Sequence, residues 1–168
     1  MSHKFIKKYN MQLFPLSENK EIYVTLDHNY FVKIFKISHK HKADNEVGIH
    51  IKASDLVSCP KIFDYFIEDD KIILIMELLD GHSLADQYGD DSSKIPEDIW
   101  KQIHTIINKL YYHDIHYIDI TPYNFMLKKE NGKPKVYIID FGDARKIEVN
   151  WFLKDFLDGF NGWNPDFA

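Results

Sequence analysis

Cysteine, long apolar runs and an excess of basic residues are all missing from this sequence. Its one cysteine, Cys59, cannot form a disulfide within the chain, which fits a reducing compartment. The longest purely aliphatic stretch, residues 72–76, is far shorter than the roughly 20 residues that span a bilayer. Residues 1–9 contain no apolar core of a secretory signal. We therefore expect an intracellular, cytoplasmic protein with no membrane partner.

Basic residues are too few to form a general nucleic-acid-binding face. The chain has 21 Lys plus Arg against 26 Asp plus Glu, a net charge of −5, so no direct nucleic-acid binding is expected. A nucleotide site remains compatible with this charge, because it needs only a few well-placed cations. With 168 residues, 45% of them apolar, the chain can bury a core as a single domain without disulfides or a structural metal.

The apolar pattern changes near residue 80. Before it, β-branched and aromatic runs predict short strands at residues 21–25, 30–35, 61–67 and 71–79, with a helix at 45–56 between the pairs. After it, Ile99, Ile103, Ile107 and Leu110 repeat at helical spacing and predict a helix over 96–112. Short apolar runs follow at 115–118, 125–127 and 136–139, with a turn at 131–134 and a last helix at 151–157. The expected fold class is α+β.

Two polar clusters interrupt the apolar runs of the second half. Asp119 and Asn124 lie in one of them, five residues apart, and Asp140 ends a buried strand just before Phe141 and Gly142. Carboxylate and amide oxygens from neighbouring loops are ligands that suit Mg²⁺, which also keeps water and phosphate oxygens. One loop can therefore present a base and a metal ligand together.

Asp-x₄-Asn followed by Asp-Phe-Gly resembles the catalytic loop and metal-binding motif of protein kinases. The resemblance extends backward through three further elements. Lys33 stands in a Val-Lys strand, Glu46 stands on the following helix, and residues 76–79 are similar to the segment that holds adenine. It implies a bilobal kinase-like fold within 1–168, with an N-lobe of an antiparallel sheet and one helix (about 1–79) and a strongly reduced C-lobe (80–168).

The same resemblance implies a role for each matching residue. Lys33 would hold the phosphates of ATP and Glu46 would orient Lys33, while the segment containing Glu77 and Leu79 would bind adenine. In the two polar clusters, Asp119 would be the base that receives the proton of the acceptor hydroxyl, and Asn124 and Asp140 would bind Mg²⁺. Phosphoryl transfer requires chiefly positioning and charge stabilisation, which these residues supply.

Several departures from the kinase pattern are equally clear. Residues 16–23 contain no glycine, Phe31 replaces a small alanine on the face of Lys33, and 26 residues follow Gly142, too few for a peptide-binding lobe. Residues 119–124 resemble the catalytic loops of RIO-type kinases and of the small kinase of the tRNA-modifying KEOPS assembly. Compact relatives of this kind occur in large DNA viruses, and the Ile-, Lys- and Asn-rich composition suits an AT-rich genome. A viral member would act in the host cytoplasm or the virion.

Three functions fit these residues. The first is an atypical ATP- and Mg²⁺-dependent serine/threonine kinase acting on an unknown protein. The second is a pseudokinase that binds a partner, favoured by Phe31 and the missing glycines. The third is a small-molecule kinase or ATPase. The histidines, including His39, His41, His113 and His116, lack the third ligand of a metal site and are read as surface or hydrogen-bonded residues.

Overall fold

The computed structural model describes residues 13–15, 21–25, 27, 29–144 and 150–167. The chain forms two compact units. The first unit comprises Met1–Asn45 and Pro60–Leu79, and the second comprises Glu46–Cys59 and Asp80–Ala168. Helix α2 (Lys40–Ser54) crosses this division, so its residues up to Asn45 belong to the first unit and the later ones to the second.

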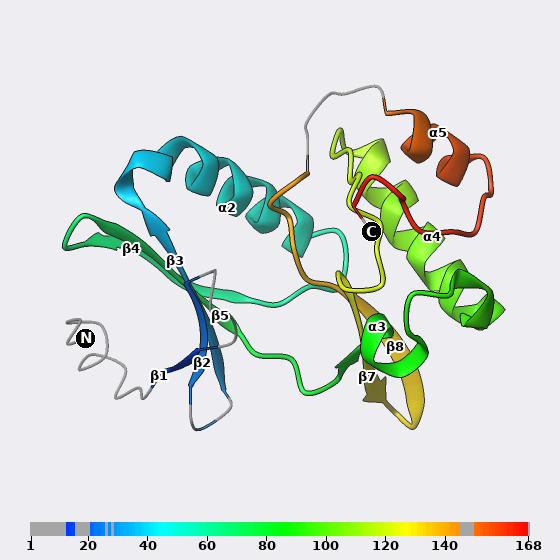
Figure 1. Cartoon of the computed structure of the whole chain (residues 1–168), viewed down its shortest axis with the longest axis horizontal. Coiled ribbons are helices and arrows are strands. Elements are labelled where there is room, and N and C mark those ends of the chain that lie inside the picture. Colours follow the sequence, from blue (N-terminus) through cyan, green and yellow to red (C-terminus); the bar gives the residue numbers. More distant parts are fainter. Residues whose placement is uncertain (1–12, 16–20, 26, 28, 145–149, 168) are drawn as a thin grey trace. The chain divides into compact units, whose positions relative to one another are not determined.

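The first unit is built on an antiparallel sheet with the strand order β1-β2-β3-β5-β4 (Figure 1). Alternation in β3 buries Val32 and Ile34 against Ile73 and Ile75 of β5, and leaves the intervening residues on the other face. The strands are β1 (Leu13–Pro15), β2 (Ile22–Thr25), β3 (Tyr30–Lys36), β4 (Ile62–Glu68) and β5 (Lys71–Glu77), and a 3₁₀ turn, η1 (Ile37–His39), precedes α2.

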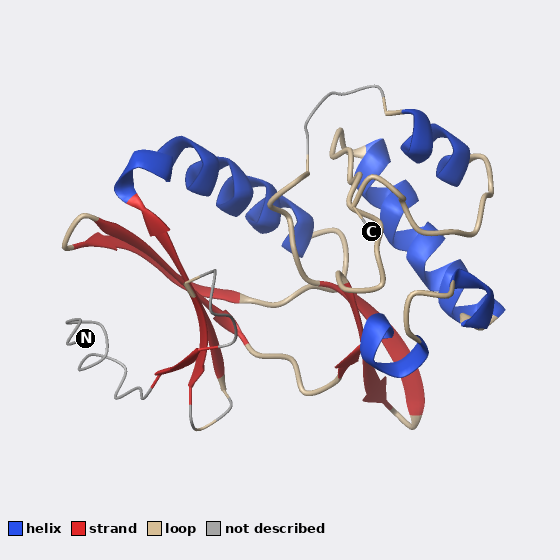
Figure 2. Ribbon diagram, viewed as in Figure 1, coloured by secondary structure: helices blue, strands red, loops and turns tan. Residues whose placement is uncertain are grey.

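The second unit combines a three-stranded antiparallel sheet with helices (Figure 2). The sheet order is β6-β7-β8, and the helix α5 packs against α4. The elements are β6 (His82–Ser83), α3 (Leu84–Tyr88), η2 (Ser92–Lys94), α4 (Glu97–Tyr112), β7 (Phe125–Glu130), β8 (Lys133–Ile138) and α5 (Trp151–Leu157).

Helix α4 organises the core of the second unit. Pro96 precedes its first residue, and Glu97 and Asp98 in its first turn complement the helix dipole. The Gln102 side chain accepts a hydrogen bond from the Val136 N–H (2.9 Å) and donates one to the Pro134 carbonyl (3.1 Å), so it satisfies backbone groups of the edge strand β8. Its buried face carries Ile99, Trp100, Ile103, Ile106, Ile107 and Leu110.

The α+β class expected from the sequence is confirmed, as are the helix near 96–112 and the last helix at 151–157. Other boundaries differ. The helix placed at 45–56 runs from Lys40 to Ser54, and the strand placed at 71–79 ends at Glu77. The turn placed at 131–134 needs only Asn131 and Gly132, because both take positive φ angles (51° and 76°).

Two short elements had no periodic signal in the sequence, the three-residue β1 and the five-residue α3. The apolar run at 115–118 belongs to none of the described helices and strands. Of the segment 16–23, which contains no glycine, residues 16–20 lie outside the described part of the chain. Residues 46–59, which the expected N-lobe of 1–79 includes, group with the second unit, and the first unit ends at Leu79.

Candidate active site

The residues predicted to act on ATP fall in both units. Glu46, Asp119, Asn124 and Asp140 belong to the second unit, which brings the last three close together. The other predicted site residues, Lys33, Glu77 and Leu79, belong to the first unit.

The loop that carries Asp119 is anchored in the core of the second unit. Ile118 and Ile120 on either side of it are buried, and the Ile120 N–H donates to the Ile118 carbonyl (2.9 Å), which makes a tight three-residue turn with Asp119 at its centre. The buried Asn164 of the C-terminal segment donates its side-chain amide to the same Ile118 carbonyl (2.7 Å), and its N–H donates to the Ile120 carbonyl (2.8 Å). The C-terminal segment therefore fixes the backbone on both sides of Asp119.

Asn124 links the Asp119 loop to the segment that carries Asp140. Its side-chain N–H donates to the Asp119 carbonyl (3.0 Å), and its own carbonyl accepts from the Ile139 N–H (3.0 Å). Asp140 comes one residue later, and its Oδ1 accepts from the Gly142 N–H (2.8 Å). These bonds orient both side chains and leave Asn124 Oδ1 and Asp140 Oδ2 without a hydrogen bond from any described residue.

Tyr117 supplies a second link to Asp140. Its hydroxyl donates to the Asp140 carbonyl (2.5 Å), and its ring packs edge-on against Phe125 and Phe141. Burial raises the pKa of this hydroxyl well above its ordinary value, and the neighbouring carboxylates raise it further. Tyr117 therefore stays a neutral hydrogen-bond donor.

The Asp119 carboxyl has an unusual pKa. Burial raises it from 3.8 to about 6, because the charged form loses water; the negative charges of Asp143 and Asp140 act in the same direction, against hydrogen bonds from Asn124 and Thr121. A carboxylate with this pKa is ionised at neutral pH yet holds a proton more readily than an ordinary aspartate. Such a value suits a general base.

The second half of α2 packs beside the Asp-Phe-Gly segment. Glu46 is only 6% exposed, and the buried His50 ring lies 4.9 Å from the Phe141 ring. A Cβ on Gly142 would lie 3.4 Å from Glu46 Oε1 and 3.1 Å from Asp140 Oδ1, so glycine permits the close approach of both carboxylates. Sequence reasoning placed Glu46 on this helix but missed the contact of His50.

In the first unit, the register of β3 places Lys33 opposite Ile22 of β2 and Leu74 of β5. Its ammonium lies 5.1 Å from the centre of the Phe35 ring. Phe31 lies two residues earlier on the same face, as the alternation of the strand predicted.

The segment proposed to hold adenine follows β5. The Glu77 N–H donates to the Lys61 carbonyl (2.8 Å), and the Glu77 side chain accepts from the Lys61 N–H (3.2 Å). The Leu78 N–H donates to the Asn29 carbonyl (3.1 Å). Leu79 is buried, and among the described residues its N–H has no acceptor. The Leu79 N–H is therefore a backbone donor of this segment that could bond a ligand.

The second unit could supply two of the oxygen ligands of a magnesium ion. The described residues contain no group of three or more His, Cys, Asp or Glu side chains that could hold a metal. Asn124 and Asp140 supply one amide and one carboxylate oxygen, and Mg²⁺ commonly completes such a pair with water and phosphate oxygens. The two oriented oxygens thus fit an ion that arrives with a nucleotide, and they do not form an all-protein cage.

The chain belongs to the protein kinase family. The family described as protein kinase domain matches residues 20–158, which cover most of both units and every predicted site residue. The structure and the match together support a reduced bilobal kinase domain.

Two similar proteins are also kinases by name. The chain is 30% identical over 136 residues to myosin light chain kinase 3 of Rattus norvegicus, covering 75% of this chain and 17% of that protein. It is 29% identical over 136 residues to myosin light chain kinase family member 4 of Homo sapiens, covering 75% of this chain and 34% of that protein. The chain thus spans between 17% and 34% of the length of these relatives. No helix in the described ranges is long and apolar enough to cross a membrane.

Proposed function

We propose that this chain is an ATP- and Mg²⁺-dependent kinase that phosphorylates serine or threonine hydroxyls of a protein. The observation that carries the proposal is the linked arrangement of Asp119, Asn124 and Asp140, in which an aspartate with a pKa of about 6 lies beside two oriented oxygen ligands. The names of the relatives, which are myosin light chain kinases, support a protein acceptor.

In the proposed reaction Asp119 aligns the acceptor hydroxyl and receives its proton. The hydroxyl oxygen forms a bond to the γ-phosphorus of ATP as the bond between that phosphorus and the β–γ bridging oxygen breaks, so ADP leaves with the bonding electron pair. The γ-phosphoryl group is thereby transferred without a covalent enzyme intermediate. The raised pKa of Asp119 helps it to hold the proton as the new bond forms.

Asn124 Oδ1 and Asp140 Oδ2 would hold the metal. Mg²⁺, when bound with the nucleotide, neutralises phosphate charge and orients the phosphates. The Asn124 side-chain N–H remains on the Asp119 carbonyl, and the Gly142 N–H on Asp140 Oδ1, so neither ligand has to give up a protein hydrogen bond.

The remaining predicted residues would bind ATP. We propose that Lys33 contacts the α- and β-phosphates with Glu46 as its partner, and that the Leu79 N–H contacts adenine next to Glu77. Phe31, on the face of Lys33, would lie against the adenine ring. The same residue also favours the second candidate function, a pseudokinase, because a phenylalanine there could fill the adenine site instead.

We further propose that the chain is a compact atypical kinase of the RIO-like kind. The support is the Asp-Ile-Thr-Pro-Tyr-Asn loop at residues 119–124, which resembles the catalytic loops of that group. An origin in a large DNA virus and a cytoplasmic location stay predictions from the sequence.

The proposal is tested with purified protein, γ-labelled ATP and a generic protein acceptor, with and without Mg²⁺. We expect label on serine or threonine of the acceptor or of the chain itself, only when Mg²⁺ is present. Asp119→Asn, prepared in the same way, should lower the transfer rate by something like 10² to 10⁴, which excludes a contaminating kinase. Release of free phosphate alone would indicate an ATPase. No nucleotide binding at millimolar ATP would indicate a pseudokinase.

A further inference from the structure

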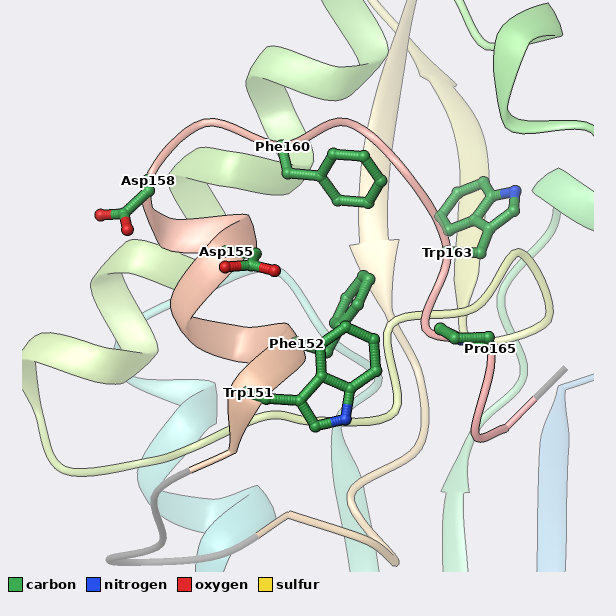
Figure 3. A pocket seen from close by; sticks show the side chains of 7 residues that line it. All are labelled: Trp151, Phe152, Asp155, Asp158, Phe160, Trp163 and Pro165. Atoms are coloured by element: carbon green, nitrogen blue, oxygen red, sulfur yellow. The ribbon is translucent and has the colours of Figure 1, made fainter.

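A surface pocket in the second unit lies outside the residues proposed to act on ATP. It has a volume of about 470 Å³ and lies between α5 and the segment that follows it (Figure 3). Its lining combines four aromatic rings and a proline with two carboxylates: Trp151, Phe152, Asp155, Asp158, Phe160, Trp163 and Pro165. No lysine, arginine or histidine is among these described residues.

The rings form a connected aromatic surface. Phe152 is 1% exposed, and both Trp151 and Phe160 pack edge-on against it, with ring centres 5.7 Å and 6.0 Å away. Trp151 and Phe160 are themselves 56% and 53% exposed. Large exposed aromatic side chains at a pocket are typical of protein–protein contacts.

The exposed rings are held in place before any partner binds. The Phe160 N–H donates to the Asp155 carbonyl (3.1 Å), and Asn161 hydrogen-bonds His104 of α4 (2.7 Å). A Cβ on Gly162 would lie 2.6 Å from the Phe160 ring, so glycine lets this ring lie against the backbone. The Trp151 indole N–H donates to Asp166 (3.3 Å). Such preorganisation lowers the entropy lost on binding.

The charges of the pocket point to a cationic ligand. Neither Asp155 nor Asp158 has a cationic partner among the described residues, and both lie at the C-terminal end of α5, where the helix dipole disfavours negative charge. In Figure 3 the Asp155 carboxylate lies on the side of the rings, whereas that of Asp158 points away from them. A cation over the aromatic faces would be attracted by the rings and by Asp155 together.

We propose that this pocket docks an arginine side chain, flanked by apolar residues, from a partner protein. A guanidinium group suits the site better than an ammonium group because it stacks on aromatic rings and forms forked hydrogen bonds to a carboxylate. The apolar flanking residues would cover the exposed parts of Trp151 and Phe160. This docking does not depend on phosphoryl transfer, so it holds for a kinase and for a pseudokinase alike.

The test is calorimetric titration of the full chain with a capped Ala-Leu-Arg-Leu-Ala peptide, its arginine-to-glutamine counterpart, and methylguanidinium alone. We expect the arginine peptide to bind at least about fivefold more tightly than the glutamine peptide. Methylguanidinium, which lacks the apolar flanking residues, should bind more weakly than the arginine peptide. Asp155→Asn should weaken the arginine peptide about fivefold and Phe160→Ala about tenfold. Gly162→Ala, which displaces the Phe160 ring without removing it, should also weaken binding.

Two matched variants control for charge and for aromatic area. Asp86→Asn removes an exposed carboxylate outside the pocket, and Tyr112→Ala removes a ring that is 84% exposed on α4; neither should change the affinity. Equal binding of the two peptides, no binding at millimolar peptide, or equal losses in the control variants would overturn the proposal. Methylguanidinium binding as tightly as the arginine peptide would overturn the assignment to a protein segment.

Discussion

The two units hold their predicted site residues by different means. In the second unit, hydrogen bonds fix the backbone at Asp119 and Asp140: Asn124 bonds Asp119 within one loop, whereas Asn164 and Tyr117 reach Ile118 and Asp140 from 46 and 23 residues away. In the first unit, the register of β3 and β5 places the corresponding residues along the sheet. Under the proposed function, the second unit would carry the chemistry on a preorganised loop, and the first unit would supply a nucleotide-binding surface set by strand alternation. Substitutions in the two units should accordingly affect rate and affinity differently.

The largest effect should come from Asp140. Asp140→Asn removes negative charge from the proposed metal ligands while it can keep the hydrogen bond from Gly142. We expect Mg²⁺-dependent ATP binding and phosphate transfer to be lost together, measured by thermal shift with nucleotide and by label transfer. The exposed Asp98→Asn serves as the control. An Asp140→Asn protein that still gains stability from Mg²⁺ and ATP would remove Asp140 from the site.

Asn164 tests whether the C-terminal segment holds the Asp119 loop. Asn164→Ala leaves the buried Ile118 carbonyl and the Asp166 N–H without this partner, so the free energy of unfolding should fall by about 2 kcal/mol. In folded Asn164→Ala protein, the transfer rate should fall by a larger factor than the affinity for ATP. Asn161→Ala, which loses one exposed bond to His104, is the control and should cost less than about 1 kcal/mol. Equal losses in both variants would contradict the proposed anchoring.

Phe31 tests the first unit. If Phe31 lies against adenine, Phe31→Ala should weaken ATP binding about fivefold and leave the transfer rate at saturating ATP nearly unchanged, because the Asp119 loop is untouched. Titration of ATP against both proteins, followed by intrinsic fluorescence, checks this expectation. Tighter binding in the variant would mean that the ring fills the adenine site, and would favour the pseudokinase.

The smallest effect is expected at Tyr117. Tyr117→Phe keeps the edge-on packing against Phe125 and Phe141 but removes the hydrogen bond to the Asp140 carbonyl. Stability should fall by about 1 kcal/mol, measured by urea unfolding. Tyr112→Phe, on an exposed side chain, should leave stability unchanged. A loss of stability no larger than in this control would mean that the Tyr117 hydroxyl does not hold Asp140.

The sequence predicted the parts of this site that follow a local pattern. Asp119 and Asn124 share one loop, and Asp140 comes two residues after the end of β8, so their closeness could be inferred from a known motif. The contributions of Asn164 and His50 could not, because each acts through a contact distant in sequence: Asn164 reaches a carbonyl 46 residues earlier. The early start of α2 was missed for another reason, since Lys40 and its polar neighbours show no apolar face before Ala43.

The central claim, that Asp119 is the base of a phosphoryl transfer, is tested most directly by the pH dependence of the transfer rate. Its pKa is raised to about 6, so the carboxylate that accepts the proton is lost as the pH falls through 6. Because this pKa belongs to the chain without bound nucleotide, kcat/KM for ATP at constant free Mg²⁺ should rise between about pH 5 and pH 7 and then level off, and Asp119→Asn should lack this rise. A wild-type kcat/KM that does not change across this range, or an Asp119→Asn protein that transfers phosphate at the wild-type rate, would contradict it.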